Sequence, residues 1–66
     1  MTLGERLKLL RDEQNLKQKE VADFMGVQPN AYSQYEKNKR TPDIYQIKNL
    51  CKLYRCSLDY LLNEVE

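Results

Sequence analysis

The apolar positions near the start of the chain recur at the spacing of an amphipathic helix. Leu3, Leu7 and Leu10 are separated by four and then three residues, so they share one stripe of a helix. Leu9 lies off that stripe, and we expect it to be exposed. The pattern fades before Asn15, a residue type that tolerates the left-handed conformation in which helices commonly end. A first helix is therefore predicted between Leu3 and Asn15.

Two shorter helical patterns meet across a tight corner in the middle of the chain, over residues 18–25 and 29–37. Gly26 allows a positive backbone angle between them, and Val27 places an apolar side chain in the corner. Pro29 suits the first position of the later helix, because the N–H that it lacks would be unpaired there anyway. Two helices joined at a wide angle by a short turn with glycine form a helix–turn–helix. The apolar positions are Val21, Ala22 and Met25 before the corner, and Tyr32 and Tyr35 after it.

The remaining apolar positions predict two more helices. A proline flanked by Thr41 and Asp43 is typical of a helix start, with either of these two residues as the cap. In the helix that follows, Tyr45 and Leu53 fall away from the apolar face, and Ser57 is the expected cap of the last helix. The fourth helix has its apolar face at Ile44, Ile47, Leu50, Cys51 and Tyr54, and the last helix at Leu58, Leu61, Leu62 and Val65.

Five short helices account for the chain, which contains no strand-like alternation, repeat or low-complexity linker. The predicted fold is all-α, with residues 1–66 as a single domain near the lower size limit for a core that folds unaided. Apolar residues are 41% and charged residues 32% of the chain, which indicates a globular domain rather than a disordered one. No apolar run approaches the ~20 residues that cross a bilayer, and no signal-peptide pattern is present. We therefore expect a cytoplasmic protein.

The helix ends differ in the quality of their predicted caps. Thr2 and Glu5 have the spacing of a capping box, in which each side chain satisfies a free N–H group of the first turn. Lys17 stands at the cap of the second helix and is a poor cap compared with serine or threonine. It could face a phosphate there or simply be an imperfect cap, and both interpretations stay open. Asn38 follows the third helix and can adopt the left-handed conformation that closes a helix.

The outer face of the third helix is polar and almost uncharged. Amides and hydroxyls offer a donor and an acceptor together, which suits the edge of a base in the major groove of DNA. A face that is merely solvated would more often carry pairs of glutamate and lysine. This blander alternative stays open, although the composition favours a face that reads bases. The residues of the face are Gln28, Asn30, Ser33, Gln34 and Lys37.

Positive charge gathers just after this helix. The net charge of the chain is only +1, which gives no general support for binding to nucleic acid. Residues 37–55, however, hold six basic groups and one acidic group, whereas residues 56–66 hold three acidic groups and no basic one. The excess lies where a phosphate backbone would run beside the third helix.

The chemistry of the chain excludes most other site types. There are two cysteines, Cys51 and Cys56, and no histidine, so a four-ligand zinc site cannot be completed locally. Core packing is the first interpretation of the two thiols, and a redox switch is the alternative. There is no pairing of a nucleophile with a base and no phosphate-binding loop, so we expect no enzymatic activity. We also expect no cofactor, metal or small-molecule ligand.

Four segments of the chain together carry a family resemblance. They are LGERLKLLR in the first helix, LKQKEVADFMGV across the second helix and the turn, NAYSQYEKNKRTPD after it, and LYRCSLDYLLN near the end. In this order they resemble the phage repressor and Cro-like (Xre-type) group of helix–turn–helix DNA-binding domains over nearly the full length. The resemblance implies a compact five-helix, lambda-repressor-like fold with the helix–turn–helix at the second and third helices.

The resemblance also implies roles for individual residues. Arg11 near the end of the first helix is expected to pair with Glu36 at the end of the third, which would fix the angle of the third helix. Base-reading positions of the family fall on Gln28, Asn30, Ser33 and Gln34. Gln18, Lys39 and Arg40 match phosphate-contacting positions. Together with two lysines suggested by their place in the pattern, the expected phosphate contacts are Lys17, Gln18, Lys37, Lys39 and Arg40.

Several residues depart from the pattern of the family. Pro29 occupies a position that holds a base-reading side chain in some relatives, so one contact is lost. Lys17 replaces the usual hydroxyl cap, and Tyr32 is larger than the usual isoleucine or valine. Asn38 and Arg55 stand where glycine is common, and asparagine tolerates the left-handed conformation better than arginine does.

The function implied by the resemblance is sequence-specific binding of double-stranded DNA by a transcriptional regulator, expected to act as a repressor. One small domain covers a half-site, so we expect a homodimer on a near-palindromic operator. The family often dimerises through residues that correspond to Cys56, Leu58 and Tyr60. The alternative is a protein-binding module of the same fold, such as an antitoxin or anti-regulator partner, which the low net charge and Pro29 slightly favour.

Overall fold

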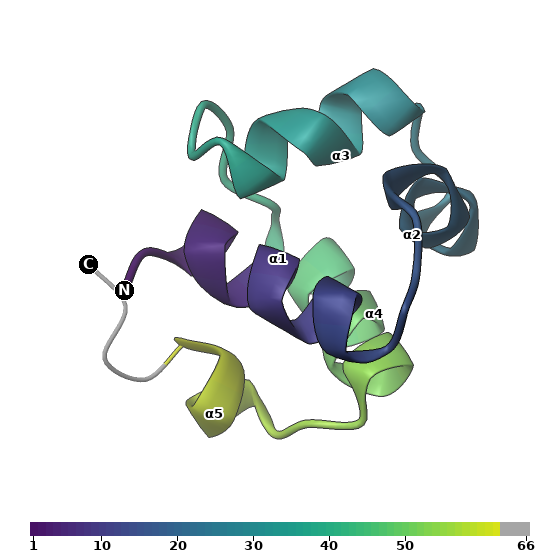
Figure 1. Ribbon diagram of the computed structural model, residues 1–66. Helices are drawn as coiled ribbons and strands as arrows, with labels where there is room; N and C mark the ends of the chain where they lie inside the picture. Colours follow the sequence, from purple (N-terminus) through teal and green to yellow (C-terminus); the bar gives the residue numbers. More distant parts are fainter. Residues whose placement is uncertain (63–66) are drawn as a thin grey trace.

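The computed structural model describes residues 1–62, which form five α-helices and no strand. The predicted all-α architecture is confirmed, and so is the position of each helix to within a residue or two. Val65, predicted to complete the apolar face of the last helix, lies outside the described residues. Figure 1 shows the order of the helices: α1 (Leu3–Glu13), α2 (Gln18–Met25), α3 (Pro29–Glu36), α4 (Ile44–Tyr54) and α5 (Leu58–Leu62).

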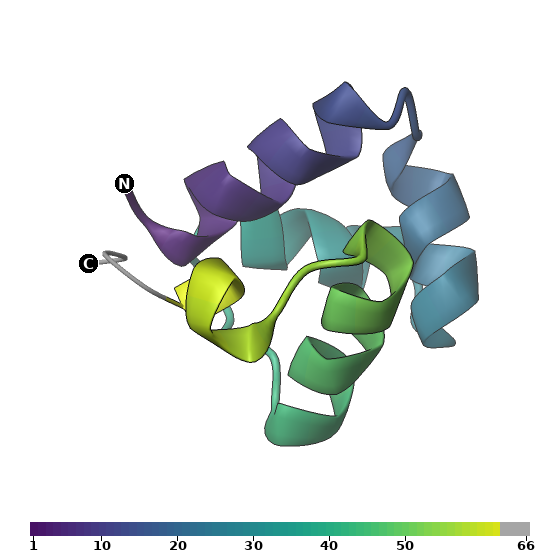
Figure 2. The same ribbon diagram turned by 90° about the horizontal axis from the view of Figure 1, so that it is seen from below.

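Helix α1 lies between α3 on one side and α5 on the other (Figure 1). Helix α2 contacts both α3 and α4, and α5 packs against α1 and α4 (Figure 2). One face of α3 therefore rests on α1 and α2, while its opposite face points away from the rest of the protein. None of the helices in residues 1–62 is long and apolar enough to cross a membrane.

The core consists of the apolar stripes that the helical spacing predicts. Leu9, predicted to lie off its stripe, is 41% exposed. Val27, predicted to fill the corner between α2 and α3, is half-buried and packs against the core. The fully packed core residues are Leu7, Leu10, Val21, Ala22, Met25, Tyr32, Tyr35, Ile47, Leu50, Tyr54 and Leu61.

For four apolar residues of α4 and α5, the burial predicted from the helical spacing is wrong. Ile44 is 54% exposed, because it is the first residue of α4 and precedes the turn that meets the core. Leu53, expected to lie off the apolar face, packs partly against the core where the chain turns from α4 toward α5. Leu58 and Leu62 are 42% and 37% exposed, because α5 is so short that it presents only Leu61 to the core.

The predicted cap of α1 is confirmed. The Glu5 backbone N–H donates to Thr2 Oγ1 at 3.2 Å, and the Thr2 N–H donates to Glu5 Oε1 at 2.8 Å. Hydrogen bonding from the Thr2 backbone N–H first, and from the Thr2 side chain second, lowers the pKa of the Glu5 carboxyl. Asn15, just beyond the helix, has a φ of 56°, the left-handed conformation expected there. The start and the end of α1 are thus set by local sequence.

The caps of α4 and α5 are provided by side chains as well. Asp43, not Thr41, caps α4: its Oδ1 accepts the Gln46 N–H at 2.9 Å. Ser57 Oγ accepts the Tyr60 N–H at 3.0 Å, as the sequence predicts for the last helix. Of the two candidates for α4, aspartate also carries the charge that suits a helix N-terminus.

The closest approach between helices lies where α1 begins. A Cβ atom added to Gly4 would lie 2.3 Å from the backbone oxygen of Glu36, which is far inside van der Waals contact. The backbone of α1 therefore touches the end of α3 directly, and only glycine leaves room for it. This contact determines how far the C-terminal end of α3 stands from the body of the protein.

Candidate nucleic-acid interface

The corner between α2 and α3 has the geometry of a helix–turn–helix. Gly26 ends α2 with a φ of 74°, the positive backbone angle predicted for it. The Val27 N–H then donates to the Ala22 backbone oxygen at 3.0 Å, which closes the last turn of α2. Gln28 precedes α3 in an extended conformation, and Pro29 occupies the first turn without leaving an N–H unpaired. The two helices are in direct contact (Figure 1).

The side of α3 that points away from α1 carries the residues expected to read bases. Gln28 and Asn30 are exposed, and Ser33 and Gln34 are half-buried. The opposite side of α3 carries Tyr32 and Tyr35, which are buried in the core. We call the first set, together with the exposed Lys37, the polar stripe: Gln28, Asn30, Ser33, Gln34 and Lys37.

At the beginning of the polar stripe, neither a capping hydrogen bond nor an acidic neighbour engages the polar groups. Gln28 is the N-cap residue of α3, yet its side chain makes no capping hydrogen bond. No acidic residue lies in the first turn of α3. The amides of Gln28 and Asn30 thus stand exposed at the positive end of the helix dipole, where an anionic or polar ligand is favoured.

Lys37, Asn38, Lys39 and Arg40 form an exposed loop after α3, which we call the basic corner. The Lys39 and Arg40 backbone N–H groups both donate to the Gln34 oxygen, at 2.9 and 3.3 Å. The loop is therefore folded back against the last turn of α3. Among residues 1–62 no carboxylate forms an ion pair with its three cations. Their charge is available to an outside anion.

Asn38 ties the basic corner to the start of α1. Its φ is 60°, the left-handed conformation predicted from the sequence. Its side chain does more than that prediction includes: Oδ1 accepts the Gly4 N–H at 2.9 Å, and Nδ2 donates to Thr2 Oγ1 at 2.9 Å. No local sequence signal points to these partners, because they lie more than thirty residues earlier in the chain.

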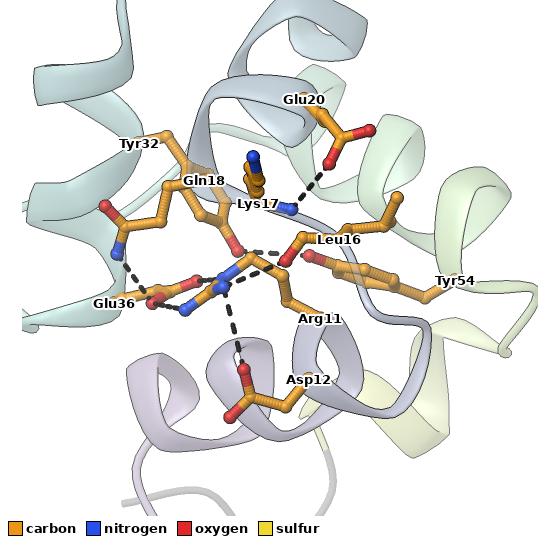
Figure 3. A network of polar contacts seen from close by, with 9 residues as sticks. All are labelled: Arg11, Asp12, Leu16, Lys17, Gln18, Glu20, Tyr32, Glu36 and Tyr54. Carbon is orange, nitrogen blue, oxygen red and sulfur yellow. Dashed lines mark hydrogen bonds and ion pairs between the residues drawn. The ribbon is translucent and has the colours of Figure 1, made fainter.

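Behind α3, the side chains of Arg11 and Glu36 meet in a bidentate ion pair (Figure 3). Arg11 Nε donates to Glu36 Oε2 at 2.6 Å, and Arg11 Nη2 donates to Oε1 at 3.0 Å. The Arg11 guanidinium also donates to the Leu16 backbone oxygen at 3.0 Å. The two side chains are only 12% and 5% exposed, so each is shielded from water by the helices that it connects.

Gln18 belongs to the same cluster. Its Nε2 donates to Glu36 Oε1 at 2.9 Å, so one of its two amide hydrogens is committed to the inside of the protein (Figure 3). The sequence resemblance assigned Gln18 to a phosphate and did not include this contact. The second amide hydrogen is the one that a phosphate could use.

The cluster keeps both members of the ion pair charged. Burial acts to raise the pKa of the Glu36 carboxyl, but hydrogen bonds from Arg11, Tyr32 and Gln18 outweigh it and leave that pKa below its usual value. The Glu36 carboxylate raises the pKa of Arg11 in return. A buried ion pair of this kind specifies geometry, because each partner would be costly to leave alone.

Lys17 stands at the N-cap of α2, and its exposed side chain makes no capping hydrogen bond, because an ammonium group cannot accept one. Half of a capping box is nevertheless formed, since Glu20 Oε1 accepts the Lys17 backbone N–H at 2.8 Å. The exposed side chain leaves the ammonium group of Lys17 at the beginning of α2.

The residues expected to form a dimer contact lie at the start of α5. Leu58 and Tyr60 are 42% and 47% exposed, whereas Cys56 is half-buried against the core. The Arg6 guanidinium of α1 lies 4.7 Å from the centre of the Tyr60 ring and also donates to the Tyr60 backbone oxygen. Tyr60 is thus held by α1, a contact that the sequence did not indicate.

Cys51 and Cys56 are free and half-buried, and both pack against the core. The Cys56 backbone N–H donates to the Cys51 oxygen at 3.1 Å, which places the two residues at the closing turn of α4. Burial raises the pKa of the Cys56 thiol, and the nearby Cys51 adds to that effect. Within residues 1–62 no group of three or more potential ligands could hold a metal ion.

Comparisons with known proteins fit this geometry. A family model described as helix-turn-helix matches residues 7–61. The transcriptional regulator ImmR of Bacillus subtilis is 41% identical over 66 residues, which are 100% of this chain and 52% of ImmR. The cryptic phage CTXphi transcriptional repressor RstR of Vibrio cholerae is 34% identical over 61 residues, which are 92% of this chain and 55% of RstR. The chain spans about half the length of the curated relatives that it matches.

Solved structures give the same result. The P22 c2 repressor, crystallised in complex with a synthetic operator, superimposes with a TM-score of 0.89 and is 32% identical, with 96% of each chain covered. The solution structure of the DNA-binding domain of the same repressor gives a TM-score of 0.90 at 31% identity, covering 97% of this chain and 84% of that one. This chain therefore belongs to the helix-turn-helix family, in the group of phage-repressor-like domains that its sequence resembles.

Proposed function

We propose that the protein is a transcriptional regulator that binds double-stranded DNA sequence-specifically and acts as a repressor. The observation that carries the proposal is the polar stripe, which is rich in amides, contains no carboxylate and is held outward by the buried tyrosines behind it. The names of ImmR as a transcriptional regulator and of RstR as a repressor support it, as does the operator bound to the P22 c2 repressor.

In this mechanism α3 enters the major groove with its N-terminal end first. Gln28, Asn30, Ser33 and Gln34 contact base edges, where each bidentate pair contributes ~1–3 kcal/mol of discrimination. Phosphate contacts set the register of α3 and dominate the affinity, which falls with salt. They come from the starts of α2 and α3 and from the basic corner: Lys17, Gln18, Lys37, Lys39 and Arg40.

A single copy covers one half-site, so the proposal includes a homodimer on a near-palindromic operator, with half-sites about one helical turn apart. The exposed Leu58 and Tyr60, with Cys56 beside them, are the proposed contact between the two copies. The protein then works in the cytoplasm on DNA alone, without enzymatic activity, cofactor or small-molecule ligand.

Selection of bound duplexes from a random pool tests the proposal most directly. We expect an enriched sequence with two related halves, bound at least a thousandfold more tightly than a scrambled duplex at physiological salt. Binding without sequence preference would overturn the base-reading role of α3. No retardation of any duplex, even at low ionic strength, would favour a protein-binding module of the same fold.

A further inference from the structure

A buried pair of tyrosines connects α4 to the recognition helix α3. The hydroxyls of Tyr54 in α4 and Tyr32 in α3 lie 3.0 Å apart (Figure 3). The two residues are 4% and 0% exposed, so water does not reach their hydroxyls freely. A buried hydroxyl costs free energy unless it is hydrogen-bonded, which makes this contact a strong constraint on how the two helices sit.

The Tyr32 hydroxyl also influences Glu36. Hydrogen bonding by the Tyr32 side chain helps to keep the pKa of the Glu36 carboxyl below its usual value. Within the tyrosine pair, either hydroxyl can donate to the other. Burial raises the pKa of Tyr32, and burial raises that of Tyr54 to about 12, so both hydroxyls keep their protons at neutral pH.

Two residues of α3 thus join it to the other three of the first four helices. Arg11 reaches Glu36 from α1, and Gln18 reaches it from α2. Tyr54 reaches Tyr32 from α4. Figure 3 shows the bonded hydroxyls of Tyr32 and Tyr54 beside the cluster of Arg11, Gln18 and Glu36.

The position of these groups on α3 decides what they control. Tyr32 and Glu36 are four residues apart, on the stripe of α3 that faces the core, and the polar-stripe residues within α3, Asn30, Ser33 and Gln34, lie on the opposite side. A rotation of α3 about its own axis would break the bonds to Tyr32 and Glu36 and would turn the polar stripe by the same angle. The bonds therefore set which side chains point outward into a groove.

We infer, on the basis of the proposed function, that Tyr54 is a positioning residue for base discrimination, acting through Tyr32 to fix the rotation of α3. Tyr54 itself is buried and does not reach the polar stripe. Its ring fills the core, while its hydroxyl supplies the only link in the network that comes from α4 among the described residues.

The test uses Tyr54→Phe, which keeps the ring in the core and removes only the hydroxyl. Affinity is measured for the duplex selected from a random pool, for the same duplex with one base pair changed in a half-site, and for a random duplex. We expect the ratio of the first two affinities to fall about three- to tenfold, the range of coupling carried by residues that touch no ligand. Affinity for the random duplex should not change.

Tyr35→Phe is the matched control. Tyr35 lies in the same helix and is 7% exposed, but its hydroxyl takes no part in the network around Glu36. It should leave the ratio unchanged. Tm values of both variants separate a loss of stability from a loss of discrimination, because a purely structural hydroxyl would lower Tm and leave the ratio intact.

Two results would overturn the inference. One is an unchanged ratio for Tyr54→Phe, and the other is an equal fall for both variants. If the unmodified chain does not distinguish the duplexes at all, the proposed function fails first and this role of Tyr54 fails with it.

Discussion

The two ends of α3 differ in what holds them. At the C-terminal end, Glu36 is bonded to Arg11 and Gln18, and the backbone touches α1 at Gly4. At the N-terminal end, Gln28 makes no capping bond and stands exposed. The protein fixes the direction of the helix from behind and leaves the groups at its front without internal partners. A rigid support and an unsatisfied reading edge are what direct recognition of a duplex requires.

The largest expected effect comes from breaking the C-terminal end. Arg11→Met leaves the Glu36 carboxylate buried without its guanidinium, which should lower the free energy of unfolding by ~3–5 kcal/mol. For so small a domain this is a large share of the total stability. Urea denaturation measures it.

A double variant sharpens this prediction. Arg11→Met combined with Glu36→Leu removes both charges and should recover much of the lost stability, because no charge is then stranded. Equal stability of Arg11→Met and the unmodified chain would mean that the ion pair does not anchor α3.

A substitution at the N-terminal end of α3 should have the opposite effect: it should leave the stability unchanged and reduce base discrimination. Gln28→Ala removes no internal hydrogen bond, so the free energy of unfolding should stay within ~0.5 kcal/mol of the original value. Discrimination between the selected duplex and its single-base variants should fall by ~1–3 kcal/mol at the position that Gln28 reads. Competition binding with a set of single-base variants locates that position. A uniform loss on every duplex would assign Gln28 to the backbone instead.

The basic corner is expected to act on affinity alone. Arg40→Ala should weaken binding to all duplexes alike and reduce the slope of log affinity against log salt by about one unit or less. Lys52→Ala is a suitable control, since Lys52 is exposed in the last turn of α4, outside the proposed interface. The salt slope of Lys52→Ala should match that of the unmodified chain. An unchanged salt slope for Arg40→Ala would show that Arg40 does not contact a phosphate.

The prediction with the smallest effect at neutral pH concerns the buried pair of Tyr32 and Tyr54. Their effect on the free energy of unfolding increases as the pH becomes alkaline. In the folded protein the pKa of Tyr54 is raised from 10.0 to about 12, so the unfolded chain loses this proton at a lower pH than the folded chain. The resulting stability is complete below pH 10 and is lost as the pH rises through 12. Denaturation at several pH values measures the decline, which should be shallower in Tyr54→Phe. An identical decline would show that other groups control alkaline unfolding.

Much of the fold could be predicted from the sequence, because spacing and caps act locally. Leu3, Leu7 and Leu10 recur at helical distances, and Thr2 with Glu5 marks a helix start whatever the rest of the chain does. The outward direction of the polar stripe followed from the same logic, since Tyr32 and Tyr35 had to face the core. Ile44 was misplaced because spacing alone does not show where along a helix the neighbouring helix begins.

The contacts that orient the candidate site could not be derived in the same way. The bond between Tyr32 and Tyr54 joins two residues that each look like ordinary core positions in their own helices. The bonds of Asn38 to Thr2 and Gly4 connect distant segments whose meeting depends on the finished packing. Pairings of this kind arise from tertiary structure, and a periodic pattern carries no information about them.

Asn38 has a practical consequence for work with the protein. Its side chain joins the first residues of the chain to the loop that carries Lys39 and Arg40, so anything fused ahead of Met1 emerges beside those cations. An acidic tag placed there would pair with the cations of the basic corner, and a bulky tag would cover them. The measured affinity for a ligand of that surface would then reflect the tag as well as the protein.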